Sequence, residues 1–302
     1  MLSDSYTNFN PRCNNVSHSN RKRNYKMAQT KPTPSAASVI QPANRWRSLL
    51  PVAAIVICTA VAHIVFYKVF GNPANFEGGD AAHGHPLNSM GIVFKGGFVI
   101  PIGMTLALTM FVFVIERAIT LIKATGKGNI DVFVKGLRNQ LRKGDVEGAI
   151  KACDNNKGSI ATVVKAGLRK YQEMEHEGGD KEHRKEAIKT EIEEATALEM
   201  PMLERNMIVI ASTASLGTLV GLIGTVLGMI RAFSALGAGG APNAAELSVG
   251  ISEALVNTAL GITTSAVSIF FYNFFNTKIE NMVHSMDEAG YSIIETFDMN
   301  VE

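Results

Sequence analysis

Hydroxyl and amide side chains interrupt two uncharged apolar stretches near the end of the sequence, at residues 207–230 and 254–277. Each stretch is long enough to cross a bilayer as a helix, and polar groups at that depth usually face protein or water. Threonine and asparagine can hydrogen-bond water or a carboxylic acid without carrying charge themselves. Such residues can pass a proton but cannot hold one, so the pattern indicates an ion path.

Two threonines are the leading candidates to line that path. Thr225 lies about 9 Å inside Arg231, and Thr258 about 7.5 Å inside Glu253, both measured from the outer ends of antiparallel helices. The two hydroxyls therefore reach nearly one level, where an oligomer can assemble them into a polar belt. On a helix, Glu253 and Asn257 point within about 60° of each other, whereas Thr258 points about 140° away from Glu253. One polar face is expected to line a pore while the other packs against a neighbouring helix or subunit.

Small residues mark one side of the stretch at residues 207–230 and predict close helix packing. Four glycines recur there at spacings of four, three and four residues, namely Gly217, Gly221, Gly224 and Gly228. In lipid such a stripe lets a neighbouring helix approach closely, and Gly261 is expected to serve the same packing from the next crossing. Thr218 lies beside the stripe and is a further pore candidate, although a membrane threonine commonly bonds its own backbone.

The sequence contains four apolar blocks and is predicted to be an all-α membrane protein with long helices that extend into a cytoplasmic helical domain. Basic residues concentrate in two polar segments, eight in residues 1–48 and sixteen in residues 123–205, so both segments are assigned to the cytoplasm. Both termini are then cytoplasmic as well. The expected segments are a disordered basic tail (1–48), an additional N-terminal crossing (49–70), an outer loop (71–97), a crossing (98–122), a cytoplasmic helical domain (123–205), a crossing (206–233), a short outer loop (234–247), a crossing (248–275) and a cytoplasmic C-terminal tail (276–302).

Three features of this organisation leave alternatives open. The first apolar block follows Arg45 and Arg47 as in a signal peptide, but its length of about 20 residues favours a retained anchor. A charged helix beginning near Lys181 is expected to run into the membrane, with Pro201 as a point where it can kink. The alternating charges of residues 181–194 fit a solvated helix face better than a docking surface.

Other functional classes are disfavoured. The three cysteines have no metal-ligand spacing and no plausible pairing. His83 and His85 lie with Asp80 in a loop rich in glycine, which indicates an exposed segment rather than a metal site. No nucleophile elbow, phosphate-binding loop or metalloprotease motif is present, so we expect no enzyme activity, cofactor, metal or nucleic-acid partner.

Two motifs resemble the MotA/TolQ/ExbB proton-channel family, and most closely ExbB and TolQ. They are VGLIGTVLGM at residues 220–229 and EALVNTALGI at residues 253–262, in an order and spacing that are highly specific. The resemblance covers residues 98–275 and implies that Thr225, Glu253 and Thr258 are pore residues. The sequence departs from the family at Thr218, where relatives usually have proline, and in its additional crossing, whose role cannot be taken from the better-known members.

The resemblance also implies an assembly. In the family, a homopentameric ring surrounds two ExbD-like or TolR-like single-span subunits, whose membrane aspartate carries the proton. This chain has no aspartate in a membrane segment, and its acid Glu253 lies near the outer end, so a mid-depth proton carrier must come from such a partner. The implied motor lies in a bacterial inner membrane, contacts its lipids, and passes energy to a TonB-like or TolA-like protein for outer-membrane transport.

Two other hypotheses stay open. The first is a stator of the same family that drives motility or envelope constriction, with sodium as an alternative to protons. The second is a non-conducting membrane scaffold, in which threonine and glycine only pack helices and Glu253 only pairs with Arg231 at the outer interface.

Overall fold

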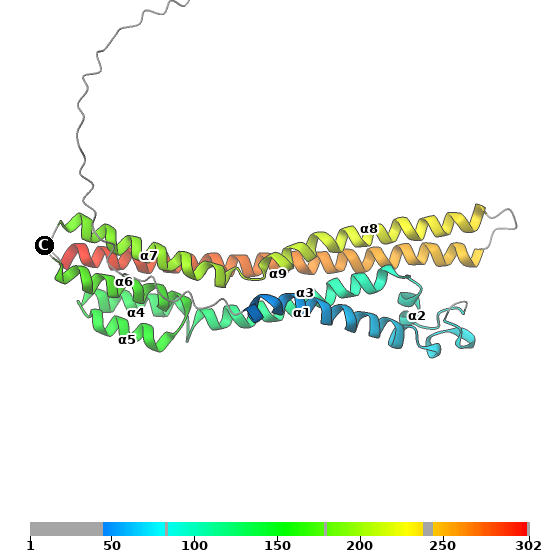
Figure 1. The fold of residues 1–302 in the computed structure, drawn as a ribbon, viewed down its shortest axis with the longest axis horizontal. Helices are drawn as coiled ribbons and strands as arrows, with labels where there is room; N and C mark the ends of the chain where they lie inside the picture. Colours follow the sequence, from blue (N-terminus) through cyan, green and yellow to red (C-terminus); the bar gives the residue numbers. More distant parts are fainter. Residues whose placement is uncertain (1–44, 82–83, 178–179, 238–243, 301–302) are drawn as a thin grey trace, which may run out of the picture. The chain divides into compact units, whose positions relative to one another are not determined.

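Four long apolar helices dominate the computed structural model, which describes residues 45–81, 84–177, 180–237 and 244–300 (Figure 1). Within these ranges every regular element is helical, apart from one isolated bridge between Phe76 and Pro86. The predicted all-α fold class is therefore confirmed for the described part of the chain. The helices are α1 (Arg45–Val65), a π-helical turn η1 (Phe66–Phe70), the 3₁₀ turns η2 (Pro73–Asn75) and η3 (Glu77–Gly79), α2 (Ser89–Phe94), α3 (Val99–Thr125), α4 (Ile130–Arg142), α5 (Val146–Asn156), α6 (Ser159–His176), α7 (Lys181–Leu203), α8 (Met207–Gly237) and α9 (Ala244–Asn300).

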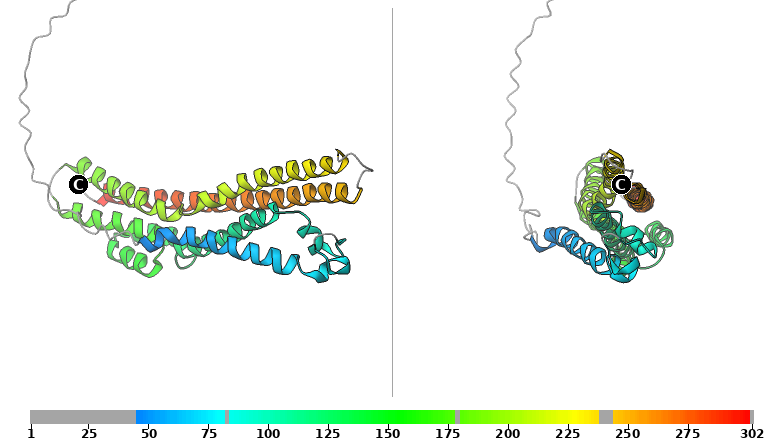
Figure 2. Two further views of the ribbon diagram at one scale, coloured as in Figure 1. Left: turned by 45° about the vertical axis from the view of Figure 1, so that its right-hand side comes forward. Right: turned by 90° about the vertical axis from the view of Figure 1, so that its right-hand side faces the viewer.

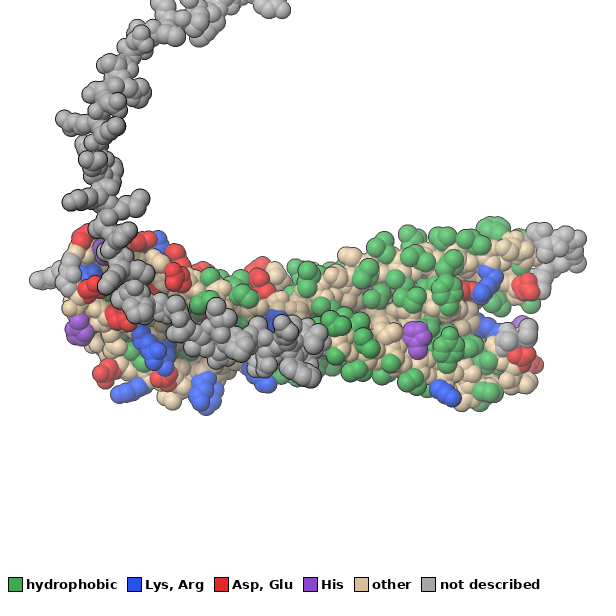
Figure 3. Space-filling model, in the orientation of Figure 1, with side chains coloured by type: hydrophobic (Ala, Val, Ile, Leu, Met, Phe, Trp, Pro, Cys, Tyr) green, Lys and Arg blue, Asp and Glu red, His purple; other side chains and the backbone are tan. Residues whose placement is uncertain are grey.

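Among the described residues, α1, α3, α8 and α9 are long and apolar enough to cross a membrane, judged by length and composition. Large apolar side chains on these helices are exposed, including Val56 and Ile64 of α1 and Leu222 of α8. Figure 3 shows hydrophobic side chains spread over the part of the molecule that contains α1, α3 and α8, whereas charged side chains gather over the end formed by α4 to α7. An exposed apolar surface of this extent fits contact with lipid or with other subunits.

The N-terminal tail predicted at residues 1–48 falls almost entirely outside the described residues, and α1 already begins at Arg45.

Helices α8 and α9 run side by side in opposite directions, as two views of the ribbon show (Figures 1 and 2). Glycines bring their backbones into contact. A Cβ atom on Gly228 would lie 2.6 Å from the backbone nitrogen of Ala254, and one on Gly221 would lie 3.2 Å from the carbonyl oxygen of Asn257. On the opposite helix, a Cβ atom on Gly261 would lie 2.5 Å from the carbonyl oxygen of Gly217. The helices therefore approach at a distance that any larger residue would prevent.

We expect Gly228→Ala to lower the thermal stability of the purified protein in detergent. The added methyl group meets rigid backbone on α9, and overpacking of this kind costs about 1–3 kcal/mol. Gly136→Ala is the matched control, because Gly136 lies inside α4 and has no neighbouring atom within 4 Å of an added Cβ. That change is expected to stabilise the helix by about 0.5–1 kcal/mol. Similar shifts of the melting midpoint in the two variants would contradict the close approach of α8 and α9.

Helix α9 continues well beyond its apolar half. Residues 276–300, assigned to a tail from the sequence, are the C-terminal half of this 57-residue helix. This half packs against α4, α6 and α7, and its buried side chains recur at helical spacing, namely Met282, Met286, Ala289, Ile293 and Phe297. The ring of Phe297 meets that of Tyr171 edge-on at 5.2 Å. The apolar stripe on one side of α9 explains why it remains helical beyond the membrane segment.

The connection between α7 and α8 corrects the expectation of a helix that continues into the membrane. Helix α7 ends at Leu203, and Asn206 has a positive φ of 61°, so the chain turns before α8 begins. Pro201 lies inside α7. The fully buried guanidinium of Arg117, on α3, donates to the carbonyl oxygen of Leu203 at 2.9 Å and also to that of Arg205. These bonds satisfy carbonyl groups that the end of a helix leaves free, which stabilises the break.

The thiol of Cys153, on α5, is buried among the helices α4 to α7 and is expected to be unreactive in the folded protein. Burial, together with the nearby charge of Asp154, raises the pKa of this thiol from 9.0 to about 12. Since the thiolate is the reactive form, a variant that retains Cys153 alone should react with maleimide at pH 8 only after unfolding. The folded state keeps this proton at pH values where the unfolded chain loses it, so stability should fall as pH rises above 9. Rapid labelling of the native protein, measured by intact mass, would contradict this placement.

Candidate functional site

The two threonines predicted to line a path lie at half-buried positions on α8 and α9. A Cβ atom on Gly221 would lie 3.6 Å from the Cα atom of Thr258, which places that threonine level with Gly221. Thr225 follows Gly221 by four residues, so the two threonines are about one helical turn apart along the axis. The paired helices thus bring them to neighbouring depths, but not to the single level expected from the sequence.

Both hydroxyl groups bond their own helix. The Oγ1 atom of Thr225 donates to the carbonyl oxygen of Leu222 at 2.6 Å, and that of Thr258 donates to the carbonyl oxygen of Ala254 at 2.8 Å. Each oxygen keeps lone pairs that can accept a hydrogen bond from water or from a protonated acid. Thr225 also lines an open hollow on the surface of α8, together with Val226, Met229, Ile230, Phe233 and Ser234.

Glu253 is buried, and its carboxylate pairs with an arginine. Only 2% of its surface is exposed, and Oε2 lies 2.5 Å from Nη1 of Arg231, whose side chain is 56% exposed. The carboxylate also lies against Gly97, where an added Cβ would be 2.8 Å from Cδ of Glu253. The acid is therefore enclosed within the subunit at the end of the α8–α9 pair, and the arginine connects it to the surface.

Asn257 lies one turn further along α9 and is also enclosed. Its Nδ2 atom donates to the carbonyl oxygen of Gly96 at 2.8 Å and to that of Glu253 at 2.9 Å. The other members of this polar face, Thr264 and Ser268, are buried as well. The face that carries Glu253 therefore packs within the subunit, whereas Thr258 on the other side of α9 stays half-exposed. Sequence analysis did not single out Gly96 and Gly97, although a glycine pair just before an apolar run was a visible signal.

Thr218 lies in the α8–α9 contact. Its hydroxyl is within 3.2 Å of the carbonyl oxygen of Ala214 and within 3.3 Å of Oγ of Ser265 on α9. Ser265 in turn donates to the carbonyl oxygen of Ala214. Thr218 is about two helical turns from Thr225, so the two threonines occupy different depths.

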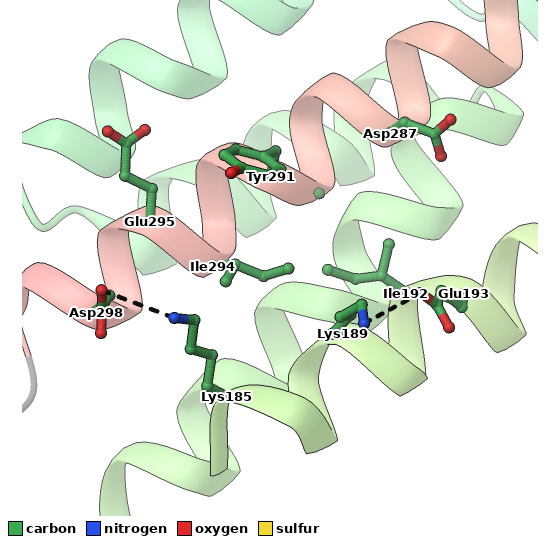
Figure 4. Close-up of a pocket in the computed structure, with 10 residues that line it drawn as sticks. Lys185, Lys189, Ile192, Glu193, Asp287, Tyr291, Ile294, Glu295 and Asp298 are labelled. Atoms are coloured by element: carbon green, nitrogen blue, oxygen red, sulfur yellow. Dashed lines mark ion pairs between the residues drawn. The ribbon is translucent and has the colours of Figure 1, made fainter. Parts of the chain in front are cut away.

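A second polar region lies between α7 and the C-terminal half of α9, where Figure 4 shows a groove lined by charged residues around Ile192 and Ile294. Nζ of Lys185 lies 3.9 Å from a carboxylate oxygen of Asp298, and Nζ of Lys189 lies 3.9 Å from one of Glu193. The side chains of these pairs are 31–66% exposed, so solvent screens them and each pair contributes little to stability. The interpretation of residues 181–194 as a solvated helix face stays a prediction.

The described residues contain no group of three histidine, cysteine or acidic side chains that could hold a metal ion. His83, one member of the loop cluster considered above, lies outside the described residues.

Comparisons with known proteins support the resemblance to one family. The sequence model of the MotA/TolQ/ExbB proton channel family matches residues 155–288, which include both motif segments, all of α8 and α9 as far as residue 288. The matched residues are thus similar to the MotA/TolQ/ExbB proton channel family. The family resemblance predicted from the two motifs is confirmed, and with four helices able to span a bilayer the chain is a multi-pass membrane protein.

Individual relatives in the family differ in how much of the chain they match. The biopolymer transport protein ExbB of Neisseria meningitidis is 26% identical over 208 residues, or 67% of this chain and 94% of that protein. The ExbB-like 3 protein of Synechocystis is 38% identical over 88 residues, 28% of this chain and 42% of that protein. The Tol-Pal system protein TolQ of Pseudomonas aeruginosa is 26% identical over 125 residues, 41% of this chain and 54% of that protein. The first of these relatives is matched over nearly its whole length, and the other two over about half.

Proposed function

We propose that this chain is the proton-channel subunit of an inner-membrane motor that couples the proton motive force to outer-membrane transport. The observation that carries the proposal is the pair of half-exposed hydroxyls, Thr225 and Thr258, about one turn apart on the α8–α9 pair of a proton channel family member. Hydroxyl groups at that depth can exchange hydrogen bonds with water and with a carboxylic acid.

The proton carrier is then supplied by a partner. The apolar segments of this chain contain no aspartate, and Glu253, enclosed near the outer end, is paired with Arg231. We infer a single-span partner of ExbD or TolR type whose membrane aspartate lies beside Thr225 and Thr258. Neutralisation and release of that aspartate would let the partner turn relative to the surrounding subunits.

The surrounding subunits are copies of this chain. A single α8–α9 pair offers a polar strip but cannot enclose a path, and its exposed Leu222, Val226 and Leu255 require cover from lipid or protein. A closed ring, expected to be a pentamer, would supply that cover and repeat the threonine pair around a central axis. Each proton moved through 100 mV would release about 2.3 kcal/mol, and a TonB-like or TolA-like protein would receive the work. In this arrangement the helical domain and both termini lie in the cytoplasm.

Co-purification followed by mass spectrometry tests the proposal most directly. The full chain, extracted in mild detergent, is expected to bring with it a small single-span protein with an aspartate in its membrane segment. Reconstitution of that complex in vesicles should then give proton flux that follows the membrane potential. A chain that purifies as an isolated subunit, or a complex that conducts no protons, would favour the non-conducting scaffold instead.

The match to a Tol-Pal system protein supports a second candidate within the same family, a motor that acts on the cell envelope rather than on transport. Deletion of the gene separates the two. Loss of outer-membrane import with normal envelope constriction would support the transport motor, whereas the reverse phenotype would support the Tol-type motor.

A further inference from the structure

The short turn between α2 and α3 meets α9 at the buried acid. Gly97 has a positive φ of 77°, and a Cβ atom at this position would overlap Oε1 of Glu253 and lie 2.8 Å from its Cδ atom. The carboxylate therefore occupies space that any side chain on Gly97 would fill. The two residues are more than 150 positions apart in the sequence, so this contact exists only in the folded chain.

Asn257 holds the same turn from the next position on α9. Its amide group bonds the carbonyl oxygen of Gly96 and that of Glu253, and it is only 3% exposed. On the other side of the turn, a Cβ atom on Gly96 would lie 2.6 Å from Cγ1 of Ile100. The turn is thus confined between α9 and the first residues of α3. We call the two glycines, Gly96 and Gly97, the glycine seat.

The glycine seat is also connected to the additional N-terminal crossing. The backbone nitrogen of Gly97 donates to the carbonyl oxygen of Phe94, the last residue of α2, at 3.3 Å. The ring of Phe94 stacks on that of Phe66, the first residue of η1, which directly continues α1; the centroids are 4.9 Å apart and the angle between the rings is 24°. Phe76 packs edge-on against Phe94 at 5.6 Å. This aromatic cluster fixes α2, and therefore the turn that follows it, against η1 at the end of the first crossing.

We propose that the glycine seat positions the Glu253 carboxylate, and that α1 braces the seat through the contact between Phe66 and Phe94. Gly97 is then a positioning residue. The additional N-terminal crossing, which most distinguishes this chain from the better-known family members, then helps to position Glu253. The inference rests on the proposed function insofar as Glu253 takes part in proton movement. A carboxylate held on one side by Gly97 and on the other by Arg231 has a single orientation, as a proton-transfer group needs.

Gly97→Ala tests the seat, and Gly128→Ala is the matched control. Gly128 also has a positive φ, 93°, but no atom within 4 Å of an added Cβ, so its substitution introduces backbone strain without a clash. Both changes are made in the wild-type chain and in a Glu253→Ala chain, and the melting midpoint of each purified protein is measured. In the wild-type chain, we expect Gly97→Ala to lower the melting midpoint far more than Gly128→Ala does. In the Glu253→Ala chain, we expect the two substitutions to lower the midpoint by similar amounts. If Gly97→Ala lowers the midpoint equally in both backgrounds, Gly97 does not position the Glu253 carboxylate and the proposal is wrong.

Proton flux in vesicles provides the functional measurement, with the complex that co-purifies from cells. A displacement of about 1 Å at a reacting group can lower a rate about 100-fold, so Gly97→Ala should lower flux by about that factor while Gly128→Ala leaves it near the wild-type value. Normal flux in an assembled Gly97→Ala complex would overturn the positioning role. A wild-type complex without flux would contradict the proposed function instead. The melting comparison needs no partner, so it still tests whether Gly97 contacts the Glu253 carboxylate.

The brace is tested with Phe66→Ala and Phe66→Leu against Ile64→Ala. Ile64 lies in the last turn of α1, two residues before Phe66, and 61% of its surface is accessible. Phe66→Ala should lower flux severalfold, Phe66→Leu should restore part of it by refilling the volume, and Ile64→Ala should have no effect. Unchanged flux in an assembled Phe66→Ala complex would overturn the brace.

Discussion

Replacement of Thr225 or Thr258 by valine is expected to abolish proton-coupled transport while the protein still assembles. Valine has nearly the same shape as threonine, and each hydroxyl bonds only a carbonyl of its own helix, at Leu222 or Ala254. Removal therefore leaves the α8–α9 packing intact. A hydrogen bond to an ionised group contributes about 1.5–3 kcal/mol, and a ring of subunits would lose that contribution once in every copy.

Thr105→Val is the control for this prediction. Thr105 lies in α3 and donates to the carbonyl oxygen of Pro101 at 2.8 Å, so its hydroxyl has the same local role on a helix other than α8 or α9. Proton flux in vesicles and size-exclusion profiles of the complex are the measurements. If the valine variants conduct as well as the control, the threonines serve helix packing and the scaffold hypothesis gains support.

Glu253→Gln is expected to lower proton flux by about 100-fold, which is the range in which a positioned acid or base acts on a proton transfer. Glutamine keeps the size of the side chain and can still bond Arg231, but it cannot take up or release a proton. The alternative is a structural ion pair. Removal of one partner from a fully buried pair costs about 3–5 kcal/mol, and less is expected here because the Arg231 side chain is 56% exposed. A loss of function from instability must still be separated from a loss of proton transfer.

The double variant Glu253→Gln, Arg231→Gln makes that separation. It removes both charges, so no unpaired charge remains beside the glycine seat, and the melting midpoint is expected to recover toward that of the wild type. Flux should stay low in the double variant if Glu253 relays protons. Recovery of flux together with stability would assign Glu253 to packing alone.

The sequence was sufficient to predict the all-α membrane fold, the family and the residues at which a polar group enters an apolar helix. Hydrophobic length and the placement of basic residues carry this information locally, since a bilayer requires about 20 apolar residues per crossing whatever the neighbours are. Helical geometry also separated Glu253 and Asn257 from Thr258 on α9. These inferences need only residues that are close together in the chain.

Helix ends were less predictable. The break before Met207 depends on the buried Arg117 of α3, which bonds the carbonyl groups at the end of α7, and the chain beyond residue 275 stays helical because α4, α6 and α7 cover one side of it. Both outcomes depend on partners that are distant in sequence. Local propensity carries no information about such partners.

The inward orientation of Glu253 and Asn257 depended on tertiary packing for the same reason. Helical periodicity divides α9 into two polar faces. Which of the two faces is buried depends on the segment that packs against it, and that segment is the glycine turn before α3. A contact across more than 150 residues forms only when α3, α8 and α9 pack together. Sequence periodicity thus defines the faces of a membrane helix, and the packing of its neighbours determines which face is enclosed and which is left for water or a partner.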